Sequence, residues 1–345
     1  MLDNKCNSCG NNLYFDVAKG QVICAKCGNG TTFEKSRNYS RHHIDLNAQI
    51  IEQKVTKAVT KHCESCGAVF TGEKNLMAKV CGYCGAPLVL DYENHGEVSP
   101  DACLPFVLTP ENARQSFYQV IKKKKFVPSE YKNGNIPDLK IQSMYIPAYS
   151  FNASTINDYD VTLERSFKDR EGYTRTVTRT VHNVLDINVN NMMLECSSFI
   201  TQGEFNDIKP FDMTAIYKYD DYYVLGYSVE NPNRTLNDIR QASKELIDKD
   251  IQRKIRDCYQ TENVRDLNIR TTYTSVDYSY FILPTYQITY TYKGKEYRNT
   301  MNGQTGKVGG KFPKSMLKIL IYVLMIMGIS IAVILLILEI FKGIF

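Results

Sequence analysis

The sequence has no tryptophan and only 5 histidines in 345 residues, and it lacks the short motifs of common catalytic sites. It contains no GxSxG elbow, no HExxH helix and no Walker loop. In Met301–Gly310, MNGQTGKVGG, the glycines are too close for GxxxxGK, and Val308 stands where Ser or Thr would bind Mg²⁺. We therefore expect a protein without catalytic activity and find no evident small-molecule substrate. An enzyme built on the β-rich region stays an alternative, for which the sequence shows no site.

A secretory signal is also missing, because the residues from Met1 to Cys9 are polar. Unpaired cysteines without an export signal predict a reducing compartment for most of the chain. The formal charge is +5 with every thiol counted as neutral. Four thiolates around one Zn²⁺ carry a net charge of −2, so two such sites would leave about +1. This balance is too small to indicate a polyanionic partner.

Cysteine, in contrast, is abundant: eight of 11 fall in two arrays of paired CxxCG motifs. Fourteen residues separate the pairs in each array, and the second array repeats the first at an offset of 57 residues. Such spacing is typical of a zinc ribbon, a small hairpin held together by a closed tetrahedral metal site. We predict two structural Zn²⁺ ions per chain. The predicted ligands are Cys6, Cys9, Cys24 and Cys27 for the first ion, and Cys63, Cys66, Cys81 and Cys84 for the second.

The glycine after each pair permits the positive φ of the turn, and each intervening stretch, such as LYFDVAKGQVI, predicts two strands joined by a turn. Disulfides do not suit a reducing compartment, and thioredoxin-like chemistry would need a βαβ context. Rubredoxin-like iron is an alternative to zinc. The histidines beside the arrays, His42, His43 and His62, are interpreted as spectators because each site already has four ligands.

The region between the ribbons and the C-terminus is rich in Tyr, Val, Ile and Thr, which predicts strands, with helices beginning near Thr109-Pro110 and near Thr235. Each helix precedes a similar strand, YIPAYSFNA (145–153) and ILPTYQITY (282–290). The repeat indicates two related halves, 94–205 and 206–312, or a chance similarity. The lysine run at 122–125 is interpreted as a helix end, with phosphate binding as the alternative.

Near the C-terminus, residues 319–338 carry no charge and as a helix would extend about 30 Å, the thickness of a bilayer core. Four lysines precede this segment and one follows it, so we expect a single-pass cell-membrane protein whose bulk is cytoplasmic. The fold class expected is α+β. The expected parts are zinc ribbon 1 (1–40), a helical connector (41–60), zinc ribbon 2 (61–93), a β-rich α+β region (94–312) and a transmembrane anchor (316–341).

The paired CxxCG arrays, LPFVLTPENA (104–113), MYIPAYSF (144–151) and IKPFDMTAIYKYDDYYVLGY (208–227) together resemble bacterial membrane-anchored proteins with TFIIB-type zinc ribbons. The segment YKGKEYRNTMNGQTGKVGGKFP before the anchor adds to this resemblance, which covers nearly the whole chain. Relatives carry an aromatic pair with Trp where this chain has Ala148-Tyr149. Members are often labelled primosomal or helicase-like, but no Walker motif supports that label here. The resemblance implies a scaffold at the inner membrane face, with flotillin-like or phage-shock-type partners.

The function expected is a non-enzymatic, zinc-binding, membrane-anchored adaptor that binds proteins through its ribbons or its β-rich region. The alternative is a nucleic-acid-binding zinc-ribbon protein tethered at the membrane, whose affinity would fall steeply with salt. The charge balance favours the adaptor.

Elemental analysis of the purified protein should find two zinc atoms per chain, because each array supplies four thiolates to one ion. Far less zinc, or the red chromophore of an iron–thiolate centre, would contradict the zinc-ribbon interpretation.

Overall fold

The computed structural model describes residues 5–46 except 32 and 34, residues 60–62, 69–71, 76–80 and 87–89, and residues 99–342 except 235. The second array, Cys63, Cys66, Cys81 and Cys84, lies outside these residues, as does most of the predicted connector (41–60). The chain forms two units, each assembled from three stretches. Unit 1 comprises residues 1–106, 144–202 and 212–284, and unit 2 comprises residues 107–143, 203–211 and 285–345.

The fold is α+β, as the sequence predicts. The described helices are α1 (Pro110–Lys123), α2 (Ser129–Lys132), α3 (Gln202–Ile208), α4 (Leu236–Asp257) and α5 (Met316–Lys342), with 3₁₀ turns η1 (Met213–Ala215) and η2 (Asp221–Val224). The N-terminal strands are β1 (Leu13–Asp16), β2 (Gln21–Cys24), β3 (Gly30–Thr31), β4 (His42–His43), β5 (Thr60–His62), β6 (Val69–Thr71), β7 (Leu76–Val80) and β8 (Pro87–Val89). The remaining strands are β9 (Ala102–Cys103), β10 (Lys140–Lys168), β11 (Thr174–Glu195), β12 (Tyr217–Lys218), β13 (Ser228–Glu230), β14 (Asn263–Tyr292), β15 (Lys295–Asn302) and β16 (Val308–Gly310).

The largest sheet is built around two very long strands, β10 and β14, in the order β12-β9-β14-β10-β13-β7-β8. Strand β11 pairs antiparallel with β10 over almost its whole length, from Ala148↔Glu195 to Lys168↔Thr174. Both YIPAYSFNA and ILPTYQITY lie in these long strands, after α1 and α4 respectively, so the predicted helix-then-strand order is confirmed. The change of unit falls between residues 143 and 144 in β10, and between residues 284 and 285 in β14.

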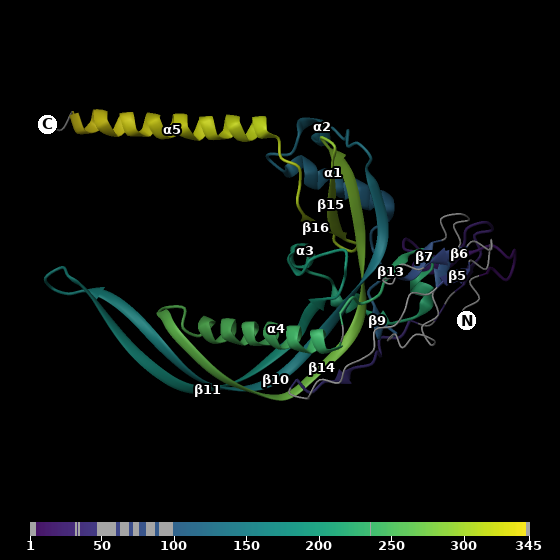
Figure 1. The fold of residues 1–345 in the computed structure, drawn as a ribbon, viewed down its shortest axis with the longest axis horizontal. Coiled ribbons are helices and arrows are strands. Elements are labelled where there is room, and N and C mark those ends of the chain that lie inside the picture. The colour runs from purple at the N-terminus through teal and green to yellow at the C-terminus, as the bar shows by residue number, and fades with distance from the viewer. Residues whose placement is uncertain are drawn as a thin grey trace. The chain divides into compact units, whose positions relative to one another are not determined.

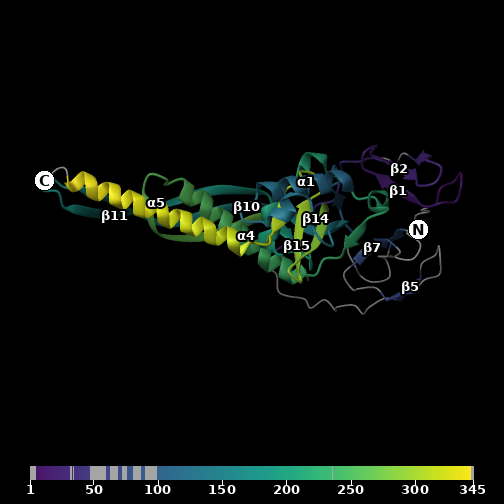
Figure 2. The same cartoon turned by 90° about the horizontal axis from the view of Figure 1, so that it is seen from above.

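Helix α4 covers one face of the curved sheet of unit 1 (Figures 1 and 2). Its apolar residues recur at helical spacing, and Ile239, Ile247, Ile251 and Ile255 are buried. Tyr273 of β14 donates a hydrogen bond to Asp248 of α4, which ties the helix to the sheet. These buried side chains belong to the core of unit 1.

At the start of the predicted helical connector, His42 and His43 are extended instead of helical. They form β4, which pairs with β14 at Tyr278 and Asp277. The N–H of Ile44 also donates to the carbonyl of Val276, over 2.9 Å. Backbone pairing to a long neighbouring strand has therefore overridden the local helical spacing at this end of the connector.

In unit 2, helix α1 begins as the sequence predicts. Thr109 caps it by accepting the N–H of Asn112, and Pro110 occupies the first turn. Phe117 and Ile121 are buried on one face of this helix. The last turn ends in lysines, as expected at the negative end of a helix dipole.

Strands β15 and β16 form the predicted return around Asn302, pairing antiparallel from Met301↔Val308 to Asn299↔Gly310. The buried Asn302 amide organises this turn. Its Oδ1 accepts the N–H groups of Gln304 and Thr305 at 2.8 and 3.1 Å. Its Nδ2 donates to the carbonyls of Ile208 and Pro210, both at 3.0 Å. The stretch that resembles a phosphate loop is therefore a structural turn.

Helix α5 is long and apolar enough to cross a membrane. The stretch Met316–Leu335 has a mean hydropathy of 2.6 and none of it is buried.

Replacing Asn302 by Ala should destabilise the protein by about 3 kcal/mol, because four buried hydrogen bonds lose their partner. Thermal unfolding of the full chain in detergent should show a lower melting temperature for Asn302→Ala. The matched variant Asn135→Ala, at an exposed position of the same unit, should melt within about 2 °C of the wild type. Equal melting temperatures for both variants would contradict the organising role of Asn302.

Candidate metal centre

The four cysteines of the first array converge at one end of a small hairpin. Cys6 and Cys9 precede β1, while Cys24 ends β2 and Cys27 follows it. The antiparallel register places Leu13 opposite Cys24, which brings the two pairs together. The Sγ atoms of Cys6 and Cys27 are 3.6 Å apart, and those of Cys9 and Cys24 are 3.4 Å apart. All four sulfur atoms lie within 4.8 Å of one another.

Both CxxCG turns have the same backbone geometry. The N–H of Gly10 donates to the carbonyl of Cys6 at 2.8 Å, and that of Gly28 donates to Cys24 at 3.0 Å. The φ angles of Gly10 and Gly28 are 67° and 73°. A Cβ atom at either glycine would meet nothing within 4 Å, so the positive φ, and not crowding, requires glycine here. The predicted role of these two glycines is confirmed, whereas Gly67 and Gly85 lie outside the described residues.

Backbone N–H groups point at the sulfur atoms and favour their charged form. The N–H of Cys27 lowers the pKa of the Cys24 thiol to about 6, and that of Ser8 lowers the pKa of Cys6. The pKa of Cys27 is raised to about 12: the N–H of Asn29 opposes this, but burial and the neighbouring sulfur atoms outweigh it. Thiolates are the form that binds a metal ion, so these donors prepare the cluster for a cation.

The cluster fits a single tetrahedral metal ion. Metal–sulfur bonds of about 2.3 Å at tetrahedral angles place sulfur atoms about 3.8 Å apart. The shorter Sγ distances in the cluster, 3.4 and 3.6 Å, are close to this value. Four thiolates would complete the coordination, which is the pattern of a structural site and not of a catalytic one.

The first ribbon is packed against the rest of unit 1 through Phe15, a buried residue of β1. The N–H of Phe15 donates to the carbonyl of Leu225 at 3.1 Å. The Phe15 ring meets Tyr223 edge-on at 5.4 Å, and Phe33 meets the same tyrosine at 4.9 Å. The hairpin therefore completes its small core with aromatic side chains from the segment around η2.

A glycine permits this close approach. Gly226 has a φ of 87°, and a Cβ atom there would lie 3.3 Å from the Cβ of Tyr14. Sequence reasoning did not identify the contact between the ribbon and residues 222–227. The available signal was the alternation of Leu13 and Phe15 in a hairpin too small to bury them, together with the tyrosine-rich stretch IYKYDDYYVLGY.

A strand of the second array pairs with the chain directly after this segment. Strand β7 runs antiparallel to β13, with Val229 opposite Ala78. Strand β8 continues the sheet beyond β7, with Lys79 opposite Leu88. Residues 225–230 therefore bind the backbone of the first ribbon at one end and that of β7 at the other.

The histidines near the arrays pair with carboxylates. His42 Nε2 lies 2.7 Å from Asp101 Oδ1, and His43 Nδ1 lies 3.3 Å from Asp277 Oδ1. Neither belongs to the cysteine cluster, and the side chain of His62 lies outside the part that the structure describes. His42 and His43 instead attach the chain after the first ribbon to the large sheet.

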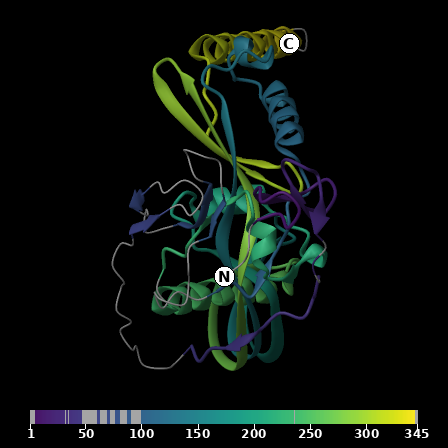
Figure 3. The same ribbon diagram turned by 90° about the vertical axis from the view of Figure 1, so that its right-hand side faces the viewer.

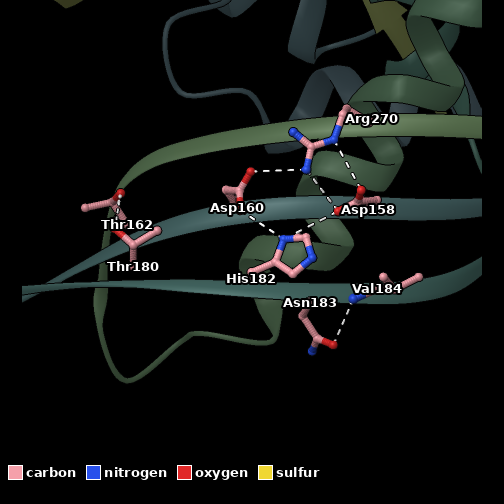
Figure 4. A network of polar contacts seen from close by, with 8 residues as sticks. All are labelled: Asp158, Asp160, Thr162, Thr180, His182, Asn183, Val184 and Arg270. Atoms are coloured by element: carbon pink, nitrogen blue, oxygen red, sulfur yellow. Dashed lines mark hydrogen bonds and ion pairs between the residues drawn. The ribbon is translucent and has the colours of Figure 1, made fainter.

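A second polar cluster crosses three strands of unit 1. Figure 4 shows Arg270 of β14 beside Asp158 and Asp160 of β10. His182 of β11 contacts the same two carboxylates through its Nδ1 atom. Arg270 holds the pKa of Asp158 below its ordinary value by hydrogen bonding. Because the guanidinium already pairs with both carboxylates, the cluster is a cross-strand ion network and a poor cation site.

A buried carboxylate, Glu230, ends strand β13. It accepts hydrogen bonds from the hydroxyls of Ser197 and Ser198 at 2.5 and 2.6 Å. Burial raises the pKa of Glu230. Arg234 donates to the neighbouring Glu195 at 3.1 Å. Glu230 is fully buried and its carboxylate oxygens accept hydrogen bonds from serines. These surroundings indicate a structural role for Glu230.

No family model matches the chain, and no solved structure matches it. The chain is 27% identical over 321 residues to a Bacillus subtilis (strain 168) protein named "Uncharacterized protein YdjG". The similarity covers 91% of this chain and 91% of YdjG, so the two proteins are alike along most of their length. The printed name assigns no activity to YdjG, so the similarity brings no function to this chain.

Replacing Cys24 by Ser should remove one zinc atom per chain, because an alcohol is a far weaker ligand than a thiolate and the site has no spare donor. Elemental analysis should then find about one zinc per chain fewer than in the wild type, for which we predict two. Cys258→Ser, at an exposed cysteine outside both arrays, should keep the full content. An unchanged zinc content in Cys24→Ser would remove the first cluster as a metal site.

Proposed function

We propose that the protein is a zinc-binding adaptor that is anchored in the cell membrane by α5 and holds its bulk in the cytoplasm. Two observations support this proposal: a closed cluster of four cysteines that fits one ion, and an apolar helix in which no residue of Met316–Leu335 is buried. The resemblance to membrane-anchored proteins with TFIIB-type ribbons agrees with both. The closed cysteine cluster is the strongest support for the proposal. A metal ion with four thiolate ligands stabilises the fold and has no open coordination position for a substrate.

Zinc is the ion proposed for the first cluster, held by Cys6, Cys9, Cys24 and Cys27. When bound, it would supply a structural cross-link between the two ends of the β1–β2 hairpin. The exact 57-residue repeat supports a second zinc at Cys63, Cys66, Cys81 and Cys84. Two ions per chain would then fix the backbone on both flanks of residues 225–230.

Membrane anchoring is supported by α5 and by the charges beside it. Lys307, Lys311, Lys314 and Lys318 lie on the N-terminal side of the apolar stretch, and Lys342 lies on the other. Positive residues favour the cytoplasmic side of a membrane, which supports a cytoplasmic location for the ribbons and the β-rich region.

The polar clusters favour a binding role over an enzymatic one, because their carboxylates already have partners within the chain. In the described part of unit 1, Asp158, Asp160 and Glu230 are engaged by an arginine or by serines. A composite surface remains for a partner, formed by the outer face of the first ribbon and the tyrosine-rich segment behind it. Protein partners of a membrane-associated complex, flotillin-like or phage-shock-type, are proposed to bind this surface.

The test compares two ways of disturbing that surface in the full chain. Phe15→Ala should loosen the ribbon from Tyr223 while the chain keeps its two zinc atoms, and Cys24→Ser should remove one zinc. After cross-linking in cells and mild extraction from membranes, both variants should lose a flotillin-like or phage-shock-type protein that the wild type retains. Phe167→Ala, at an exposed aromatic of the β10–β11 hairpin, is the matched control and should retain it.

If both variants keep the same partners as the wild type, the ribbon surface is not a docking site and the adaptor proposal fails. Release of the full chain from membranes by alkaline carbonate would separately contradict the anchor, because a spanning helix resists such extraction.

A further inference from the structure

The lysine run at the end of α1 lies at the base of α5, although nearly 190 residues separate the two segments in the sequence. The Phe126 ring meets the Tyr322 ring at 5.4 Å in an edge-on contact. The Lys125 ammonium lies over the same tyrosine, 6.0 Å from its centre. These contacts join the residues after α1 to the second turn of the apolar helix, and both segments belong to unit 2.

Backbone contacts hold the two segments together. The N–H of Ser315 donates to the carbonyl of Phe126 at 2.7 Å. The Lys318 ammonium donates to the carbonyl of Val127 at 2.8 Å. Lys124 lies 4.8 Å over the ring of Phe312, directly before α5. Figures 1 and 3 show the segment that carries α1 and α2 beside the beginning of α5.

These contacts place Lys124, Lys125 and Lys318 at the beginning of α5. Together with the lysines that adjoin them in the sequence, they are named the lysine collar. Its members are Lys122, Lys123, Lys124, Lys125, Lys311, Lys314 and Lys318. All are exposed except Lys318, which is half-buried. None of them forms an ion pair with a carboxylate in the part of the chain that the structure describes. The acidic residue nearest to the run in sequence is Glu130 of α2, which is exposed.

The helix dipole accounts for only part of the collar. Lys122 and Lys123 lie in the last turn of α1, where positive charge is favourable. Lys124 is the C-cap and Lys125 lies beyond the helix, while Lys311 and Lys314 belong to another segment. The dipole of α1 therefore does not explain the lysines outside its last turn, of which Lys124, Lys125 and Lys318 lie at the beginning of α5.

We propose that the lysine collar binds the phosphate groups of anionic phospholipids in the leaflet that α5 enters. This inference rests on the proposed membrane crossing of α5. Met316 and Leu317, 73% and 67% exposed, begin the apolar surface immediately beside the collar. Lysines and a tyrosine at this level match the headgroup layer, where ammonium groups meet lipid phosphates and aromatic rings lie at the interface. A soluble polyanion would compete with the bilayer for the same position.

The chain itself offers a reporter, since it contains no tryptophan. In the full chain carrying Tyr322→Trp, a single indole would lie beside the collar and keep an aromatic ring against Phe126. The protein is reconstituted into vesicles of equal parts phosphatidylglycerol and phosphatidylcholine, with bromine on one lipid or on the other. Bromine quenches indole fluorescence on contact. We expect brominated phosphatidylglycerol to quench more strongly than brominated phosphatidylcholine.

Adding Lys124→Gln, Lys125→Gln and Lys314→Gln should lower the preference for phosphatidylglycerol by at least about fivefold, the effect expected from a single basic residue near an anionic surface. The same three positions changed to Arg should keep the preference, because the charge remains. The control triple Lys218→Gln, Lys244→Gln and Lys249→Gln removes three equally exposed lysines from unit 1 and should also keep it.

The outcomes separate this inference from the anchor on which it rests. Equal quenching by the two brominated lipids, or an unchanged preference in the collar triple, would overturn lipid binding by the collar while leaving α5 in the bilayer. Loss of the preference in the control triple would overturn it as well, because net charge alone would then be responsible. No quenching by either lipid would show that α5 does not enter the bilayer, and both proposals would fall.

Discussion

The antiparallel register of β1 and β2 is the constraint on which the N-terminal part of the structure depends. Leu13 opposite Cys24 brings four sulfur atoms to one point. The same register directs Phe15 onto Tyr223 in unit 1. A slip by one residue would turn every side chain of the strand to the other face, so the cysteine cluster and the aromatic contact would be lost together. The cysteine cluster and the packing of the ribbon are therefore consequences of a single hairpin geometry.

Because the cysteine cluster and the aromatic contact depend on the same hairpin, the first ribbon is part of unit 1. A zinc ribbon on a flexible linker would be an independent binding module, but here one side of the hairpin is already occupied by residues 222–227. Val229, three residues after Gly226, pairs with β7 of the second array. An ion at the first cluster would thus stabilise the conformation of a segment more than 200 residues away in sequence. A partner would meet the ribbon and the tyrosine-rich segment as one surface.

Features with local causes could be predicted from the sequence. The first ribbon hairpin, the capped start of α1, the turn after Asn302 and the apolar α5 each follow from short-range spacing, capping or hydropathy. Strand extents could not be predicted, because β10 and β14 continue through Pro147 and Pro284, where the missing N–H normally ends a ladder. The extended His42–His43 and the contact of Phe15 with Tyr223 depend on residues far away in the chain. No local pattern specifies such partners.

The helix dipole explains only part of the lysine run at the end of α1. Its position at a helix end is confirmed, and the dipole stabilises charge there by about 0.3–1 kcal/mol per residue within the last turn. The further ammonium groups of Lys124, Lys125 and Lys318 near the beginning of α5 work against this. Two like charges 4 Å apart repel by about 1 kcal/mol in water and by more beside an apolar surface. The contacts of Phe126 with Tyr322 and Ser315 hold the two segments together in spite of that repulsion. Negative charge supplied from outside the described chain would offset it, and the headgroup layer at the start of an apolar helix is where such charge is most concentrated.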